Sequence, residues 1–125
     1  MNLLLDTHVV LWWFDNPDLL SEKARAAISQ GENMVFISAA AAWEIAIKKA
    51  LGKLEAPDNL EAVMAEEDFQ PLPITIPHAL AVAALPPIHQ DPFDRMQVAQ
   101  AKAESLTLVS RDALIGQYEI PLIVA

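Results

Sequence analysis

Short apolar runs alternate with helix-forming segments along this chain, and that alternation limits the fold more than any other feature. The runs are too short for helices and rich in leucine, isoleucine and valine, which is typical of strands buried on both faces of a parallel sheet. Strands separated by helices predict an α/β fold with a central, mostly parallel sheet of four to five strands and helices on both faces. We expect the strands at residues 2–5, 34–37, 106–109 and 121–124, with a short edge strand within 69–76.

Capping residues predict where the helices between these strands begin. Serine, threonine and aspartate bind the free N–H groups of a first helical turn, and proline fits the first helical position. On this basis we expect helices over 8–14 capped by Thr7, over 39–51 capped by Ser38, and over 93–104 capped by Asp91. Shorter helices are expected to begin at Ser21, Asp58 and Pro77, and near Asp112.

The composition narrows both the size class and the available chemistry. With 125 residues, 54% of them hydrophobic, the chain is expected to form one domain over residues 1–125 with a buried core. The absence of cysteine excludes disulfide scaffolds, thiolate metal sites and a cysteine nucleophile. Only three histidines are present, so carboxylates are the best-supplied metal ligands, and oxygen ligands favour Mg²⁺ or Mn²⁺.

Charge and hydropathy bear on location and partners. The net charge of −9 argues against a nucleic-acid partner, but six of the acids lie within residues 55–68, a segment without lysine or arginine. No stretch approaches the roughly 18 apolar residues of a membrane span, and the first residues lack the basic charge of a signal peptide. We therefore expect a cytoplasmic protein with no membrane partner.

Four acidic residues are predicted to meet at one edge of the sheet. Asp6 ends the first strand and Asp112 follows a later one, whereas Glu44 and Asp94 lie near the starts of helices. The ends of parallel strands and the starts of the following helices share one edge, which is where such sheets bind ligands. Four carboxylates would repel one another there, so their convergence predicts a divalent cation held by Asp6, Glu44, Asp94 and Asp112.

These acids also have purely structural interpretations. Asp91 and Asp94 fit the cap and third helical position of an ordinary helix start. Glu44 can form an ion pair with Lys48 one turn later, and Asp112 can act in a helix cap. At this point the structural and the metal-binding interpretations both stay open.

Four other residues at the same edge are candidates for supporting roles. Thr7 and Ser110 could add a hydroxyl ligand or a hydrogen bond to the acids. Arg95 and Arg111 could contact phosphate, or each could simply balance the aspartate beside it. A carboxylate-held Mg²⁺ or Mn²⁺ polarises phosphoryl oxygens and lowers the pKa of bound water, so the predicted site points to phosphodiester hydrolysis.

Four groups of residues occur in a fixed order along the chain. They are Leu-Leu-Leu-Asp-Thr-His at 3–8, Ile-Ser at 37–38 leading to Trp-Glu-Ile at 43–45, His-Gln-Asp-Pro-Phe-Asp-Arg at 89–95 with Ala-Gln-Ala at 99–101, and Leu-Val-Ser-Arg-Asp at 108–112. Together they resemble the PIN-domain ribonucleases, and more closely the VapC-type toxins of bacterial toxin–antitoxin modules. The resemblance covers essentially the whole chain.

The resemblance implies a PIN-like three-layer α/β/α fold and a Mg²⁺- or Mn²⁺-dependent endoribonuclease that acts on RNA. The family's metal-site acids correspond to Asp6, Glu44, Asp94 and Asp112, and its frequent polar position near the last acid corresponds to Ser110. The resemblance further implies a homodimer and a cognate antitoxin that inserts a segment into the active-site groove.

Two alternatives belong to other functional classes. A receiver-like signalling module would have adjacent acids after the first strand, where Thr7 follows Asp6, and a lysine after a late strand, where this chain has Arg111. A PIN-like interaction module that binds a partner and cuts nothing also stays open. His78 and His89 flank prolines and are predicted to be loop residues without a direct role.

Overall fold

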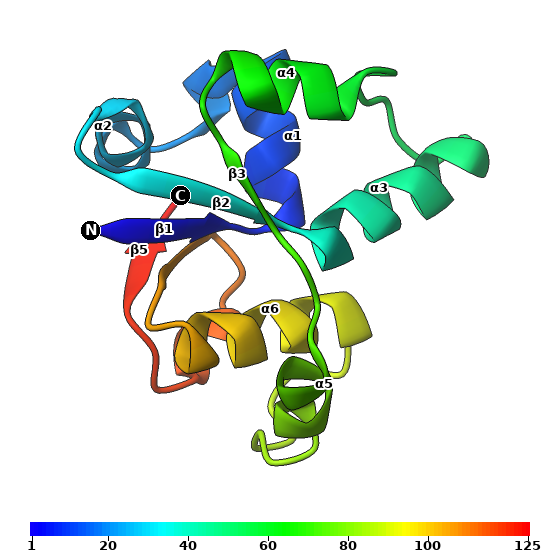
Figure 1. Cartoon of the computed structure of the whole chain (residues 1–125), viewed down its shortest axis with the longest axis vertical. Coiled ribbons are helices and arrows are strands. Elements are labelled where there is room, and N and C mark those ends of the chain that lie inside the picture. Colours follow the sequence, from blue (N-terminus) through cyan, green and yellow to red (C-terminus); the bar gives the residue numbers. More distant parts are fainter.

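The computed structural model describes residues 1–125 and contains one sheet of five strands (Figure 1). Their order across the sheet is β3-β2-β1-β4-β5, so the first strand of the chain lies at the centre. Every neighbouring pair is parallel, which confirms the expected α/β fold and its short edge strand. The strands are β1 (Asn2–Leu5), β2 (Met34–Ser38), β3 (Gln70–Leu72), β4 (Thr107–Ser110) and β5 (Leu122–Val124).

The central strand is buried on both faces because its residues form a continuous apolar run. Successive side chains of a strand point to opposite faces. Leu3 and Leu5 accordingly pack into one hydrophobic core and Leu4 into the other, and all three are fully buried. Leu5 is in register with Ile37 of β2 and Val109 of β4. The residues that follow these three strands therefore emerge at the same edge of the sheet.

Helices cover both faces of the sheet and complete three layers. In Figure 1, α1, α2 and α4 lie on one side of the sheet, and α5 and α6 lie on the other. None of the helices is long and apolar enough to cross a membrane. The α-helices are α1 (Thr7–Asp15), α2 (Glu22–Ser29), α3 (Ala39–Ala50), α4 (Leu60–Glu66), α5 (Ile76–Val82) and α6 (Pro92–Ala103), and single 3₁₀ turns form η1 (Pro17–Leu19) and η2 (Ile115–Gln117).

The start of α1 differs from the sequence prediction. Asp6, not Thr7, caps this helix, because the Asp6 Oδ1 atom accepts a hydrogen bond of 2.9 Å from the backbone N–H of Val9. Thr7 is the first helical residue and is buried. The helix expected near Asp112 is also shorter than predicted, since only the 3₁₀ turn η2 forms there.

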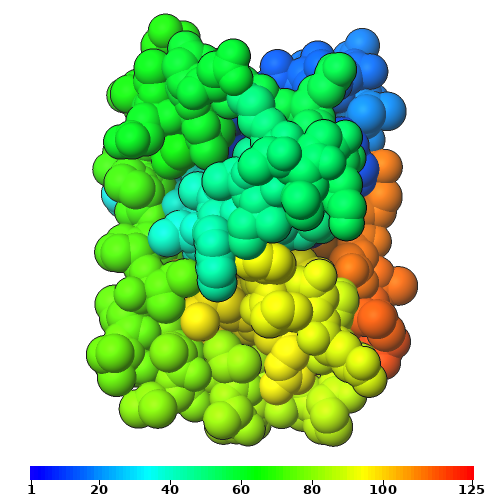
Figure 2. Space-filling model, turned by 90° about the vertical axis from the view of Figure 1, so that its right-hand side faces the viewer, coloured from blue at the N-terminus to red at the C-terminus, as the bar shows by residue number.

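The carboxyl edge of the sheet is where strand ends and helix starts meet. Ser38 ends β2 and caps α3 through a hydrogen bond of 2.9 Å from the backbone N–H of Ala40. Asp91 caps α6, as predicted, by accepting hydrogen bonds from the N–H groups of Phe93 and Asp94. Figure 2 faces this end of the molecule, where α3 (blue-green) lies above α6 (yellow) with the segment after β4 (orange) beside them.

Gly52 should contribute to stability through its backbone conformation. Its φ angle of +70° lies in the left-handed region, where a Cβ atom is unfavourable, whereas Gly31 has an ordinary φ and open space around it. We expect Gly52→Ala to lower the free energy of unfolding by about 1–2 kcal/mol, as measured by urea denaturation. Gly31→Ala is the matched control and should leave stability unchanged or slightly raised. Equal effects of the two substitutions would contradict this assignment.

Candidate metal centre

Three of the four predicted acids line one pocket at the carboxyl edge of the sheet. Asp6 comes from the start of α1, Asp94 from the first turn of α6, and Asp112 from the segment after β4. The pocket has a volume of about 310 Å³. Its lining consists of Asp6, His8, Trp12, Asp94, Arg111 and Asp112. The tertiary structure thus brings together acids that lie up to 106 residues apart in the sequence, from Asp6 to Asp112.

Asp6 is the most buried of the three acids that line this pocket and is only 5% exposed. Burial raises the pKa of its carboxyl group above the ordinary value, because the charged form loses water. The hydroxyl of Ser110 and the N–H of Val9 act in the opposite direction, and the charge of Asp112 adds to the rise. Ser110 therefore contacts the acid cluster, as its position in the sequence had suggested.

Asp94 is the acid whose ionisation is most disturbed. Burial, followed by the negative charge of Asp91, raises its pKa to about 7, and the charges of Asp6 and Glu44 add to the effect. The nearby His89 opposes the rise without cancelling it. A substantial fraction of Asp94 is therefore protonated near neutral pH when only these side chains surround it.

The pKa of Asp112 is shifted downward, in contrast to the pKa of Asp94. Burial acts to raise its pKa, but hydrogen bonds from His89 and from the N–H groups of Leu114 and Ile115 together hold the pKa below its ordinary value. The Oδ1 atom accepts from Leu114 at 2.8 Å and the Oδ2 atom contacts His89 Nε2 at 2.9 Å. Asp112 is thus a fixed, ionised carboxylate at the rim of the pocket.

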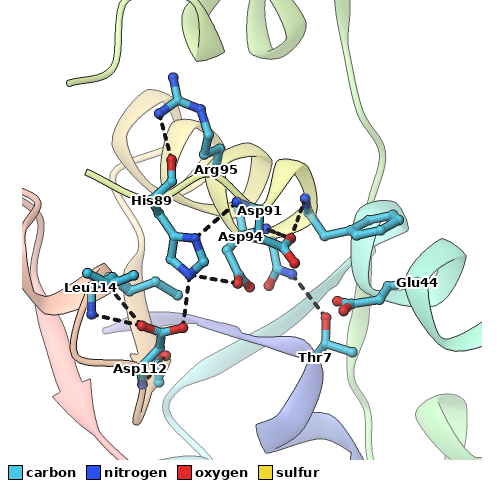
Figure 3. A network of polar contacts seen from close by, with 12 residues as sticks. Thr7, Glu44, His89, Asp91, Asp94, Arg95, Asp112 and Leu114 are labelled. Atoms are coloured by element: carbon cyan, nitrogen blue, oxygen red, sulfur yellow. Dashed lines mark hydrogen bonds and ion pairs between the residues drawn. The ribbon is translucent and has the colours of Figure 1, made fainter. Parts of the chain in front are cut away.

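His89 is the residue of this site that the sequence analysis missed. Its Nε2 atom lies 3.0 Å from Oδ2 of Asp94 and 2.9 Å from Oδ2 of Asp112 (Figure 3). One potential ligand atom from each of these three residues lies within 4.8 Å of the others. His89 lies in a loop, as predicted. However, its position two residues before the cap of α6 indicated that it belongs with Asp94.

Glu44 does not line the pocket. One of its carboxylate oxygens forms an ion pair with Lys48, and the other has no partner, so the structural and the metal-binding interpretation each apply to one oxygen. Glu44 is 3% exposed, and its Oε2 atom accepts a hydrogen bond of 2.5 Å from Lys48 Nζ, which is the predicted ion pair. Its Oε1 atom is buried without a partner. Buried polar atoms are seldom left unsatisfied, so this oxygen is available to a further ligand next to Asp94.

The two arginines do not balance the aspartates beside them. Arg95 donates to the backbone carbonyls of Val82, Pro86 and His89 and contacts the Tyr118 hydroxyl, so its guanidinium is used within the fold and does not line the pocket. For Arg95, the placement thus favours neither of the two roles that the sequence left open, a contact with phosphate or the balancing of Asp94. This side chain instead fixes the loop that precedes α6.

Arg111 does line the pocket, and it is held in place from two sides. Its guanidinium donates to the carbonyls of Leu19 and Ala125, and its central carbon lies 4.4 Å from the centre of the Trp12 ring. Such a cation–π contact orients the charged group over the aromatic face. The hydroxyl of Thr7, by contrast, accepts a hydrogen bond of 3.2 Å from Gln97.

The residues present fit a hard divalent cation. The pocket supplies carboxylate oxygens, which Mg²⁺ and Mn²⁺ prefer, and two of its acids have raised pKa values, mainly because they are buried and in addition because other carboxylates lie nearby. The unpartnered Oε1 atom of Glu44 indicates the same deficit of positive charge. A bound cation would remove both penalties.

A family model for the PIN domain matches residues 3–120. The chain therefore belongs to the PIN domain family, which confirms the resemblance drawn from the ordered motifs. No curated protein matches the chain by sequence.

Solved structures with the same fold agree with this assignment. The chain is similar to DNA-bound VapBC from Salmonella typhimurium, with 18% identity, a TM-score of 0.71, and coverage of 98% of this chain and 97% of that one. It is also similar to VapBC2 from Rickettsia felis bound to a promoter DNA fragment, with 12% identity, a TM-score of 0.70 and 98% coverage of both chains. A toxin–antitoxin complex from Klebsiella pneumoniae matches with 19% identity, a TM-score of 0.65, and coverage of 97% and 95%.

The raised pKa of Asp94 predicts a specific pH dependence of stability in the presence of a chelator. Because the folded protein holds this proton more tightly than the unfolded chain, the stabilisation is complete below about pH 4 and is lost as the pH rises through about 7. We expect the Tm of the wild type to fall relative to that of Asp94→Asn between pH 5 and 8. The relative fall should be at least about 3 °C, which corresponds to roughly 1 kcal/mol. Parallel profiles of the two proteins in a thermal melt would contradict the assignment.

Proposed function

We propose that this protein is a Mg²⁺- or Mn²⁺-dependent endoribonuclease that acts as the toxin of a toxin–antitoxin pair. The observation that carries the proposal is the convergence of Asp6, Asp94 and Asp112 on one pocket of a PIN domain. Three acids from separate elements, two of them with raised pKa values, form a site suited to a cation and, through it, to an anionic substrate.

In this proposal Asp6, Asp94 and Asp112 would hold the ion, and Glu44 on α3, whose buried Oε1 atom has no partner, lies close enough to act on the charge of Asp94. A divalent cation bound there would supply Lewis acidity to a phosphoryl oxygen and would lower the pKa of a bound water, which is the chemistry of phosphodiester hydrolysis. The residues of the chain supply the orientation: the N–H of Val9 and the hydroxyl of Ser110 fix Asp6. Asp94 must release its proton when the site is loaded, so metal binding should strengthen as the pH rises through about 7.

An RNA partner is compatible with the net charge of −9 because the positive guanidinium of Arg111 lies on the pocket wall. Arg111 lines the pocket and is held over Trp12, and His8 lines the same pocket. These side chains can meet the backbone phosphates of RNA beside the acids. An RNA substrate in turn implies a cytoplasmic location. We also propose one domain over residues 1–125, because a single sheet contains all five strands from β1 to β5.

The proposed antitoxin rests on the solved structures of similar fold, which are complexes. VapBC from Salmonella typhimurium and the toxin–antitoxin complex from Klebsiella pneumoniae both match nearly the whole chain. We infer that this protein likewise binds a cognate antitoxin, which inserts a segment into the groove that contains the acids.

The proposed homodimer has a candidate surface next to the metal centre. An apolar groove of about 260 Å³ lies between α3, α5 and α6, and two large apolar side chains that line it are exposed, Trp43 by 61% and Ile74 by 37%. Contact with a second copy of the chain would remove this surface from water. The groove is lined by Ala40, Trp43, Ile74, Ala79, Val82, Pro92, Phe93 and Met96.

The nuclease proposal predicts metal-dependent cleavage that requires Asp6. Purified protein incubated with total cellular RNA should cleave it with Mn²⁺ and not with EDTA, and Asp6→Asn should reduce cleavage at least about 100-fold. Asparagine caps helices about as well as aspartate, so α1 should form normally in the variant.

The control is the Tm. Without metal, the Tm of Asp6→Asn should be close to that of the wild type, and millimolar Mn²⁺ should raise the Tm of the wild type only. A protein that binds a partner but cuts nothing would show no cleavage under any condition. Cleavage that persists in EDTA or in Asp6→Asn would remove the cation or Asp6 from the mechanism.

The dimer proposal predicts that a charge at the apolar groove separates the subunits. Sedimentation equilibrium should give twice the chain mass for the wild type and the chain mass for Trp43→Lys, because a lysine cannot be buried there without a partner. Met34→Lys is the matched control: Met34 is also exposed but begins β2 at the opposite edge of the sheet, so this variant should stay dimeric. A monomeric wild type would contradict the proposal.

A further inference from the structure

His89 is fixed by three hydrogen bonds that do not involve the acids. Its backbone N–H donates to the Tyr118 hydroxyl at 2.9 Å, and its carbonyl accepts from Arg95 at 3.1 Å. The Nδ1 atom of the ring accepts from the backbone N–H of Asp91 at 3.1 Å. Both the backbone and the ring of this residue are therefore held, and 11% of the side chain is exposed.

The bond from Asp91 determines which ring nitrogen carries hydrogen. A backbone N–H can only donate, so Nδ1 must offer its lone pair and the hydrogen of the neutral ring lies on Nε2. That Nε2–H group points between the Oδ2 atoms of Asp94 and Asp112, at 3.0 Å and 2.9 Å (Figure 3). The ring thus bridges two acids that come from different elements of the fold.

The same hydrogen excludes direct metal binding by His89 in this arrangement. A ligand nitrogen needs a free lone pair, and here the Nδ1 lone pair is used by Asp91 while Nε2 carries hydrogen. The bridge instead offsets the repulsion between the two carboxylates and sets the separation of their Oδ2 atoms. Groups that orient metal-binding side chains typically change metal affinity 10- to 100-fold when removed.

We propose that His89 is a positioning residue whose Nε2–H group holds Asp94 and Asp112 at the spacing that binds the divalent cation, and that His89 is not itself a ligand. The inference rests on the proposed function, because it assumes that these acids hold the ion. It adds a residue that acts through the acids and does not touch the cation.

Two substitutions test the roles of the two ring nitrogens of His89 separately. Asparagine places its side-chain oxygen near the position of Nδ1, so His89→Asn can keep the bond from Asp91 and loses the donor to the acids. Glutamine reaches the position of Nε2 with an N–H donor, so His89→Gln can keep the bridge without an imidazole nitrogen.

His78 provides a matched control outside the pocket. Its Nδ1 atom accepts from the backbone N–H of Thr75 at 3.1 Å, and its Nε2 atom contacts Glu104 at 2.8 Å, which repeats the local arrangement of His89. His78→Asn should therefore lower the Tm as a lost buried hydrogen bond does, and leave Mn²⁺ affinity within about threefold of the wild type.

The test is calorimetric titration of each full-length protein with Mn²⁺, together with electron spin echo measurements of nitrogen coupling to the bound Mn²⁺. We expect His89→Asn to weaken binding about 10-fold or more, His89→Gln to stay within about threefold of the wild type, and the wild-type spectrum to lack the coupling of a directly bound imidazole. If His89→Asn does not fold, His89→Gln and the spectrum decide the question.

Three results would overturn the inference alone: wild-type affinity in His89→Asn, an equal loss in His89→Gln, or the coupling of a bound imidazole in the wild type. Failure of the wild type to bind Mn²⁺ at all is a different outcome. It would overturn the proposed metal dependence and, with it, the role given to His89.

Discussion

The repulsion between carboxylates at the carboxyl edge of the sheet is the interaction on which the rest of this structure depends. A parallel sheet delivers its strand ends and helix starts to one edge, and in this chain three of those positions carry aspartates that share a pocket. Burial is the main cause of the raised pKa values of Asp6 and Asp94, and repulsion from the neighbouring carboxylates adds to it. Elements on both sides of the sheet hold these acids close together despite their mutual repulsion. Such unfavourable clusters of charge are typical of sites that bind a ligand.

The surroundings of the pocket show how the fold restrains this charge. Asp6 is both a helix cap and a site residue, so the start of α1 fixes its carboxylate. The loop before α6 is fixed by Arg95, which binds several of its carbonyls, and by the Tyr118 hydroxyl, which accepts from His89. Because Asp91 then caps α6, the positions of His89 and Asp94 follow from one short segment. Stability and the geometry of the site are therefore coupled in the same residues.

The negative net charge and a nucleic-acid substrate can be reconciled through the distribution of the charges. Many of the acids lie in or around α4, away from the lining of the pocket, and Lys49 forms an ion pair with Asp58 in that region. At the pocket, Arg111 is held over Trp12 by two backbone carbonyls. Local potential around a site, and not the total charge, governs the approach of an anionic ligand at physiological salt, where exposed charges are screened beyond about 8 Å.

The sequence by itself determined the layers of the fold and the edge at which the acids gather, because apolar runs and helix caps act over a few residues. Strand positions, the cap at Asp91 and the convergence of Asp6, Asp94 and Asp112 all follow from such local rules and from parallel topology. Only the tertiary structure decided that His89 bridges Asp94 to Asp112, which lies 23 residues after His89 in the chain. It also decided that Arg95 donates to backbone carbonyls and that one oxygen of Glu44 has no partner. Those contacts depend on side-chain directions and on distances between remote segments. A local pattern places His89 beside the start of α6, but it does not give the direction of the ring or the distance to Asp112.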